Sequence, residues 1–124
     1  MVEALDGKKK YGQLELSNGR MSKIRTGDLM IGMLGERKAL VGIVGIVPQS
    51  IRVGDTLHVL NIAGVLGKAV SWNKDVVTAP IRVRAVGTVL VDGKPLLLNQ
   101  ISHKIDEDAV FSTPIIAVVG TAMN

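Results

Sequence analysis

Short apolar runs, separated by turn residues at intervals of about eight to twelve positions, dominate the chain. They predict strands over residues 29–34, 40–47, 57–61 and 64–70. No long stretch shows the spacing of an amphipathic helix. The pattern therefore predicts an all-β chain.

Two turn sequences predict hairpins. Asn18-Gly19 follows a short apolar segment, and a two-residue turn of this type places both residues at positive φ. Asp92-Gly93 joins a predicted strand over 81–91 to a returning strand over 96–98. Both connections favour antiparallel pairing.

A pentapeptide occurs twice, each time before a predicted strand. Ile24-Arg25-Thr26-Gly27-Asp28 is echoed by Ile51-Arg52-Val53-Gly54-Asp55. Gly27 and Gly54 supply a backbone conformation that is costly for other residues, and the Asp28 and Asp55 carboxylates can accept hydrogen bonds from nearby N–H groups. We expect these four residues to be structural, and the echo suggests a duplicated half-barrel.

Taken together, the patterns predict a small closed or partly open antiparallel β-barrel of about six to eight strands, with an internal duplication. We expect a basic N-terminal arm over 1–12, the barrel over 13–114 and a final strand segment over 115–124. The run 40–47 is apolar on both faces, so its outer face needs a cover. A flanking loop, a second copy or a following domain would provide it, and the alternative is a strand buried on both faces in a sandwich.

Composition narrows the class of protein. The apolar fraction is 47%, yet the chain has one Trp, one Tyr and one Phe, so β-branched and other aliphatic residues must build the core. There is no cysteine, which excludes disulfides and thiolate chemistry. No apolar run approaches the ~20 residues of a membrane helix, so we expect a cytoplasmic protein without a membrane partner.

The net charge of +4 is unevenly distributed. Cations on one surface can bind nucleic acid through its phosphates, although the stacking aromatics of single-strand readers are scarce here. An exposed, solvated surface explains the same residues without a ligand. The candidate anion contacts are Lys8, Lys9, Lys10, Arg20, Lys23, Arg25, Arg82 and Arg84.

Candidate catalytic chemistry is sparse. His58 and His103 are the only near-neutral bases, and Ser102 is adjacent to His103, where the two side chains rarely face one another. The acidic run 106–108 lacks the spacing and central glycine of a calcium loop. We predict no catalytic residue, no metal site and no cofactor for this chain.

The segment 115–121 has the pattern that begins a nucleotide-binding P-loop. An apolar strand runs into Gly120-Thr121, whose backbone N–H groups could begin to cradle a phosphate. The Gly-Lys that completes the motif is absent. ATP or GTP with magnesium is therefore an expectation only for a longer parent protein, and the alternative is simply the last strand of a barrel.

The order of these segments resembles the HAS-barrel, which precedes the ATPase core of HerA-type DNA translocases and has a relative in ATP synthase subunits. The likeness rests on Arg25-Thr26-Gly27-Asp28, on 39–46, on 81–87 and on Val118-Val119-Gly120-Thr121. It does not extend over 61–77. The resemblance implies a non-catalytic barrel that helps to assemble a ring and contacts partners.

Three functions follow for testing. The first is an interaction or oligomerisation domain associated with a P-loop NTPase, which makes contacts with further copies or with a following domain. The second is a nucleic-acid-binding barrel that uses the basic N-terminal region. The third is a small enzyme with a loop pocket near His58 or His103.

Overall fold

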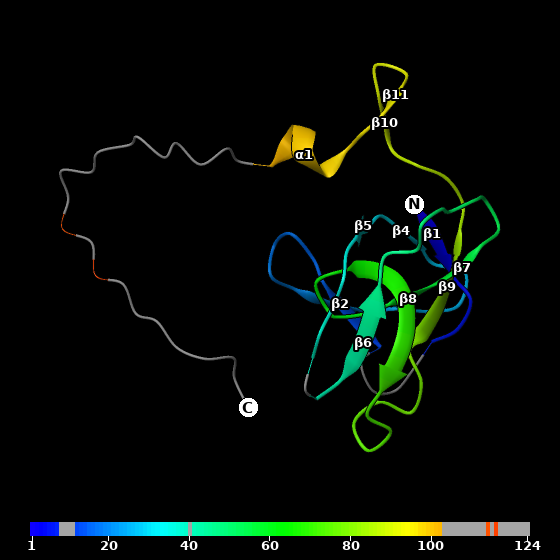
Figure 1. The fold of residues 1–124 in the computed structure, drawn as a ribbon, viewed down its shortest axis with the longest axis vertical. Helices are drawn as coiled ribbons and strands as arrows, with labels where there is room; N and C mark the ends of the chain where they lie inside the picture. Colours follow the sequence, from blue (N-terminus) through cyan, green and yellow to red (C-terminus); the bar gives the residue numbers. More distant parts are fainter. Residues whose placement is uncertain (8–11, 40, 103–113, 115, 117–124) are drawn as a thin grey trace.

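The structure is a computed structural model, and it describes residues 1–7, 12–39, 41–102, 114 and 116. Its main sheet follows the order β4-β1-β9-β7-β8-β5, with β6 beside β8 (Figure 1). The sheet curls into an open half-barrel of six strands, which confirms the predicted all-β, partly open barrel. The elements are β1 (Val2–Ala4), β2 (Gln13–Glu15), β3 (Met21–Lys23), β4 (Leu29–Met30), β5 (Met33–Leu34), β6 (Ile43–Ile46), β7 (Thr56–Val59), β8 (Val65–Trp72), β9 (Ile81–Ala85), β10 (Leu90–Val91), β11 (Lys94–Pro95) and α1 (Leu98–Ile101).

The first strand lies inside the main sheet. β1 pairs antiparallel with β4 on one side and with β9 on the other. Val2 and Ala4 are buried, because alternate residues of a strand share the face that meets the core. Residues 2–4 therefore belong to the sheet, whereas the sequence analysis assigned them to a basic N-terminal arm over 1–12.

The stretch 29–34 supplies both edges of the curled sheet. Its first half, β4, pairs with β1, and its second half, β5, pairs with β8. Only Ile31 and Gly32 separate the two strands, so the single predicted strand is broken where the chain crosses from one edge to the other. The β5–β8 pair is parallel, whereas the other described strand pairs are antiparallel.

The repeated pentapeptide forms the same turn twice. Gly27 and Gly54 have φ of +89° and +96°, and the Asp28 and Asp55 carboxylates each accept a 2.7 Å hydrogen bond from the N–H three residues earlier. Each glycine N–H donates to an alanine carbonyl of the neighbouring strand, and the same alanine N–H donates to the aspartate carbonyl. The alanine is Ala4 in β1 for the first turn and Ala85 in β9 for the second.

These two turns belong to two equivalent units. In the first, the turn leads into β4, which pairs with β1; in the second, it leads into β7, which pairs with β9. β1 and β9 pair with each other, and Glu3 lies opposite Arg84 at the midpoint of the register. An approximate local two-fold axis at this pair relates the units, so the sequence echo corresponds to a repeat in the fold.

The two hairpins differ in their turns. In β2–β3 only Gly19 has positive φ, at +78°, and the Gly19 N–H donates to the Leu16 carbonyl, so the expectation for Asn18 was wrong. A three-residue loop of this kind needs one positive φ. In β10–β11 both Asp92 (φ 50°) and Gly93 (φ 75°) are positive, as a two-residue hairpin turn requires.

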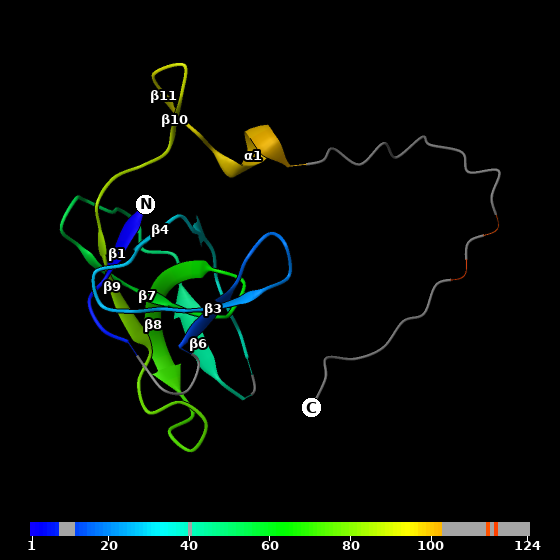
Figure 2. The ribbon, with the colours of Figure 1, turned by 180° about the vertical axis from the view of Figure 1, so that it is seen from behind.

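The second hairpin is shorter than predicted, and its returning strand lies earlier in the sequence. β9 ends at Ala85, and β10 pairs with Lys94–Pro95 instead of with residues 96–98. Leu98 begins the short helix α1. Both the hairpin and α1 project from the half-barrel in the two opposite views (Figures 1 and 2).

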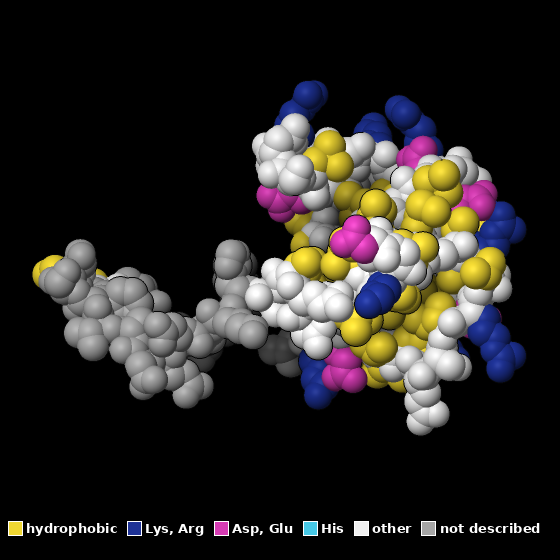
Figure 3. All heavy atoms as spheres, turned by 90° about the horizontal axis from the view of Figure 1, so that it is seen from above, with side chains coloured by type: hydrophobic (Ala, Val, Ile, Leu, Met, Phe, Trp, Pro, Cys, Tyr) yellow, Lys and Arg dark blue, Asp and Glu magenta, His cyan; other side chains and the backbone are white. Residues whose placement is uncertain are grey.

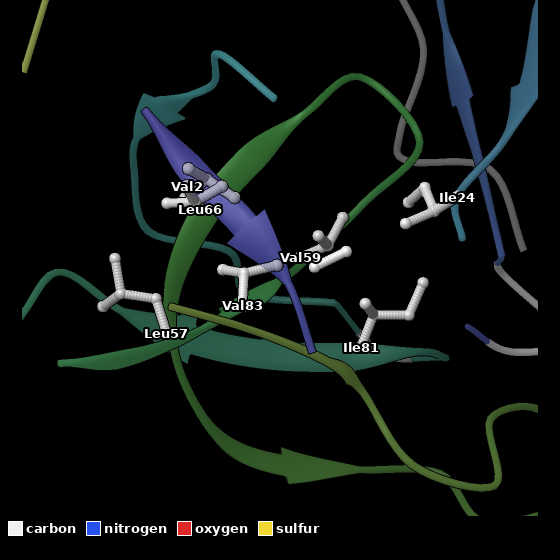
Figure 4. Packing of buried hydrophobic residues seen from close by; sticks show 8 residues of the cluster. Val2, Ile24, Leu57, Val59, Leu66, Ile81 and Val83 are labelled. Carbon is white, nitrogen blue, oxygen red and sulfur yellow. The ribbon is translucent and has the colours of Figure 1, made fainter. Parts of the chain in front are cut away.

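Aliphatic side chains from separate strands converge in the main core (Figure 4). Val83 of β9 is fully buried among residues of β1, β7 and β8, as the predicted β-branched core requires. A second cluster centres on Leu60, which packs with Ile43 and Val77 under β6 and β8. The main core contains Val2, Ala4, Ile24, Leu57, Val59, Leu66, Ile81 and Val83.

Candidate functional site

An apolar groove opens onto the main core. Its volume is about 790 Å³, and its floor includes the buried side chains of Val2, Leu57 and Leu66. One wall comes from the link between β4 and β5, another from the second Gly-Asp turn, and a third from α1 and the segment before it. The groove therefore gathers segments that are far apart in the sequence.

The rim of the groove is aliphatic and exposed. Val53 is 76% exposed and Ile31 is 72% exposed, although turns and links usually carry polar residues. Seen from the side of the hairpin and α1, hydrophobic side chains gather in the middle of this face and most charged side chains surround them (Figure 3). We define the rim residues as Ile31, Met33, Leu34, Val53, Leu97, Leu98 and Ile101.

Local geometry explains how the rim forms. Gly32 lies so close to β8 and its preceding turn that an added Cβ would be 2.5 Å from the Gly64 carbonyl oxygen. This close approach draws the neighbouring Ile31 and Met33 to the groove. On the other wall, Val53 lies in the second Gly-Asp turn, which the hydrogen bond from the Arg52 N–H to the Asp55 carboxylate holds in place. Val53 does not belong to the main core.

The groove carries almost no charge. Among the described residues that line it, Arg52 has the only charged side chain, and the N-terminal ammonium of Met1 is a second positive group, which donates to the Gly87 carbonyl at 2.7 Å. The Arg52 backbone N–H donates to the Asp55 carboxylate. No Asp or Glu side chain is among the described residues that line the groove. Such a surface favours an apolar ligand or partner with a negative charge at its margin.

Two of the candidate anion contacts are already paired. Arg82 and Arg84 share the outer face of β9, as strand alternation predicted. The Arg82 Nε donates to Asp6 at 2.9 Å, and an Arg84 Nη donates to Glu3 at 2.6 Å. A nucleic-acid phosphate would have to compete with these carboxylates for the guanidinium groups.

The other predicted cations are more scattered. Arg20 lies in the β2–β3 turn, Lys23 ends β3 and Arg25 begins the first Gly-Asp turn; all three are exposed. Residues 8–10 lie outside the described residues. Their contribution to a basic surface remains a prediction from the sequence.

His58 has a structural partner. Its Nδ1 accepts a hydrogen bond from the Ala69 N–H at 3.2 Å, at the point where β8 leaves β7 and continues beside β6. Burial lowers the pKa of His58 below its ordinary value, Arg82 and Lys68 act in the same direction, and Asp6 opposes them. The described residues contain no group of three or more His, Asp or Glu that could hold a metal ion.

His103, the acidic run 106–108 and the P-loop-like Gly120 and Thr121 lie outside the described residues. In the described part of the chain, no helix is long and apolar enough to span a membrane.

The groove itself was missed by the sequence analysis. The apolar surface was expected around 40–47, where Val41 and Ile46 are indeed exposed, but the groove lies elsewhere. A usable signal was present: Ile31 and Val53 are large aliphatic residues beside glycines in turn-like sequences. Their convergence depends on the fold.

Comparisons with protein families, with curated proteins and with solved structures found no match. The likeness to the HAS-barrel therefore stays a hypothesis from the sequence.

Proposed function

We propose that this chain is a non-catalytic β-barrel interaction module that binds a protein partner through the apolar groove. The observation that carries the proposal is the continuous aliphatic rim around an open groove of about 790 Å³. Contiguous apolar surface of this kind is rare on a protein that acts alone and is typical of contact sites.

The size of the rim supports a protein partner. Its seven side chains are between 46% and 76% exposed. Apolar side chains with this exposure, placed around one opening, offer a contact surface to a partner of protein size. Covering them would remove exposed apolar surface from water.

A P-loop NTPase domain is the parent context that the sequence favours. The support is the apolar sequence over 115–119 followed by Gly120-Thr121, together with the order of segments that resembles the HAS-barrel. In that context the barrel would assemble copies or contact the nucleotide-binding domain, and ATP or GTP with magnesium would belong to that domain. An in-frame Gly-Lys-Ser or Gly-Lys-Thr in the coding sequence after residue 124 would support this association, and a stop codon there would contradict it.

Site-specific photo-crosslinking tests the contact function. A photoreactive phenylalanine is placed at Val53 or Ile31 of the full chain, in cells that naturally express the protein. Lys74 is the matched control, because it is exposed after the far end of β8 and does not line the groove. We expect the same adduct, identified by mass spectrometry, from both groove positions and none from the control.

The identified partner is then tested with purified proteins. Val53→Lys should weaken its binding about tenfold or more, since it places a charge in a desolvated contact. Absence of a groove-specific adduct, or equal adducts at Lys74, would refute the proposed function.

A further inference from the structure

The β10–β11 hairpin presents apolar side chains without a described cover. Leu90 is 56% exposed and Val91 is 51% exposed. Among the described strands, β10 and β11 pair only with each other, and they project from the half-barrel in both views (Figures 1 and 2). An isolated two-stranded hairpin is marginally stable in water, so this one would gain from packing on a further surface.

The groove of the same copy lies at the base of the hairpin. Val89 and Leu96 flank the two strands, are joined by a 2.8 Å backbone hydrogen bond and line the groove. Leu90 and Val91 come next along the hairpin and do not line it.

The hairpin and the groove have complementary chemistry. The groove has aliphatic walls, and Arg52 is its only charged side chain among the described lining residues. The hairpin has two exposed aliphatic side chains, Asp92 in its turn and Lys94 opposite Val91. A hairpin inserted into a groove would therefore bring apolar surface to apolar surface and an anion toward a cation.

We infer that two copies of this chain form a two-fold dimer in which the hairpin of each packs into the groove of the other. The inference rests on the proposed contact function and names a second copy as the occupant. A two-fold arrangement uses each hairpin and each groove once, so the assembly closes at two copies.

Sedimentation velocity over a range of protein concentrations tests the dimer. The wild-type chain should change from monomer to dimer as its concentration rises. Leu90→Lys on the hairpin and Val53→Lys on the groove should each weaken self-association about tenfold or more. Val70→Lys is the control, because Val70 is also an exposed valine, at 52%, but does not line the groove.

Cysteine crosslinking tests the pairing independently of charge effects. The chain has no cysteine, so Leu90→Cys and Val53→Cys each introduce a unique thiol. A mixture of the two single variants should form a disulfide-linked dimer faster than either variant alone. Arg52→Glu, which retains the backbone N–H of the turn, should slow the reaction because it places a carboxylate beside Asp92.

The results separate this inference from the proposed function. A wild-type chain that stays monomeric, or a mixture that crosslinks no faster than the single variants, would overturn the dimer. If Val53 then photo-crosslinks a different, identified protein, the contact function stands. If it crosslinks nothing, both fail.

Discussion

At the scale of single residues, two glycines make room for one leucine. Leu60 is fully buried, and a Cβ added at Gly45 would lie 2.5 Å from its side chain. A Cβ at Gly67 would lie 2.8 Å from the Ile46 carbonyl oxygen and 2.9 Å from Leu60. These glycines are required by close packing, since neither has positive φ.

We therefore predict that Gly67→Ala destabilises the fold by about 1–3 kcal/mol, the usual cost of overpacking. The clash is with backbone, which cannot move without disturbing the β6–β8 pairing. Urea denaturation followed by circular dichroism measures the free energy of unfolding. Gly87→Ala is the control, because nothing lies within 4 Å of a Cβ added there. Equal effects at the two positions would contradict the packing argument.

His58 makes the fold sensitive to pH. Burial lowers its pKa in the folded chain relative to the unfolded chain. Between the lowered pKa and the ordinary value near 6.5, the unfolded chain binds more protons. The contribution of neutral His58 to the free energy of unfolding is thus fully present above pH ~6.5. It is lost as the pH falls through the folded-state pKa.

We expect thermal stability to decrease as the pH falls below about 6.5, before the carboxylates begin to titrate. His58→Gln should flatten the profile in this window, because its amide oxygen can accept the Ala69 N–H without titrating. Thermal unfolding of both chains at matched ionic strength measures the difference. An unchanged profile in His58→Gln would assign the pH effect to other groups.

At the scale of elements, the Gly-Asp turns show how a local motif becomes part of a sheet. Each turn is locked internally by its aspartate and is joined to an adjacent strand by two backbone hydrogen bonds. The internal lock could be predicted from the pentapeptide, since Gly and Asp have well-defined turn chemistry. The docking onto Ala4 and Ala85 could not, because it joins segments distant in sequence.

Because both turns make the same hydrogen bonds, Asp28→Ala and Asp55→Ala should lower the free energy of unfolding by similar amounts. We expect about 1–2 kcal/mol for each, the usual loss when a backbone N–H loses a side-chain acceptor. Asp→Asn at the same positions should cost less, because the amide oxygen still accepts a hydrogen bond. Chemical denaturation of the four variants checks this, and a large difference between the two turns would argue against their equivalence.

Turn residues alone did not predict the geometry of both hairpins. Asn-Gly and Asp-Gly suggested the same two-residue turn, yet only Asp92-Gly93 forms it. The β2–β3 hairpin has a three-residue loop because Leu16 bonds with both Gly19 and Arg20. The leucine run after Pro95 suggested a strand, but β11 ends at Pro95 and Leu98 begins a helix.

At the scale of the whole molecule, the open sheet explains why an apolar groove exists. The edges β4 and β5 are both very short, and the core between them is covered only in part by α1 and its preceding segment. The main core and the groove are therefore continuous, with Val2, Leu57 and Leu66 belonging to both. A partner that fills the groove would extend the core of the barrel.

Local chemistry within the chain was enough to indicate an all-β fold, the two Gly-Asp turns and the presence of hairpins. These features depend on residues that are neighbours along the chain, such as Gly27 and Asp28, or on alternation within one strand, such as Arg82 and Arg84. Only the tertiary structure placed residues 2–4 inside the sheet and residues 29–34 at both of its edges. It also brought Ile31, Val53 and Ile101 together around one groove. Those contacts join distant segments, and their energy comes from burial that exists only once the sheet has curled.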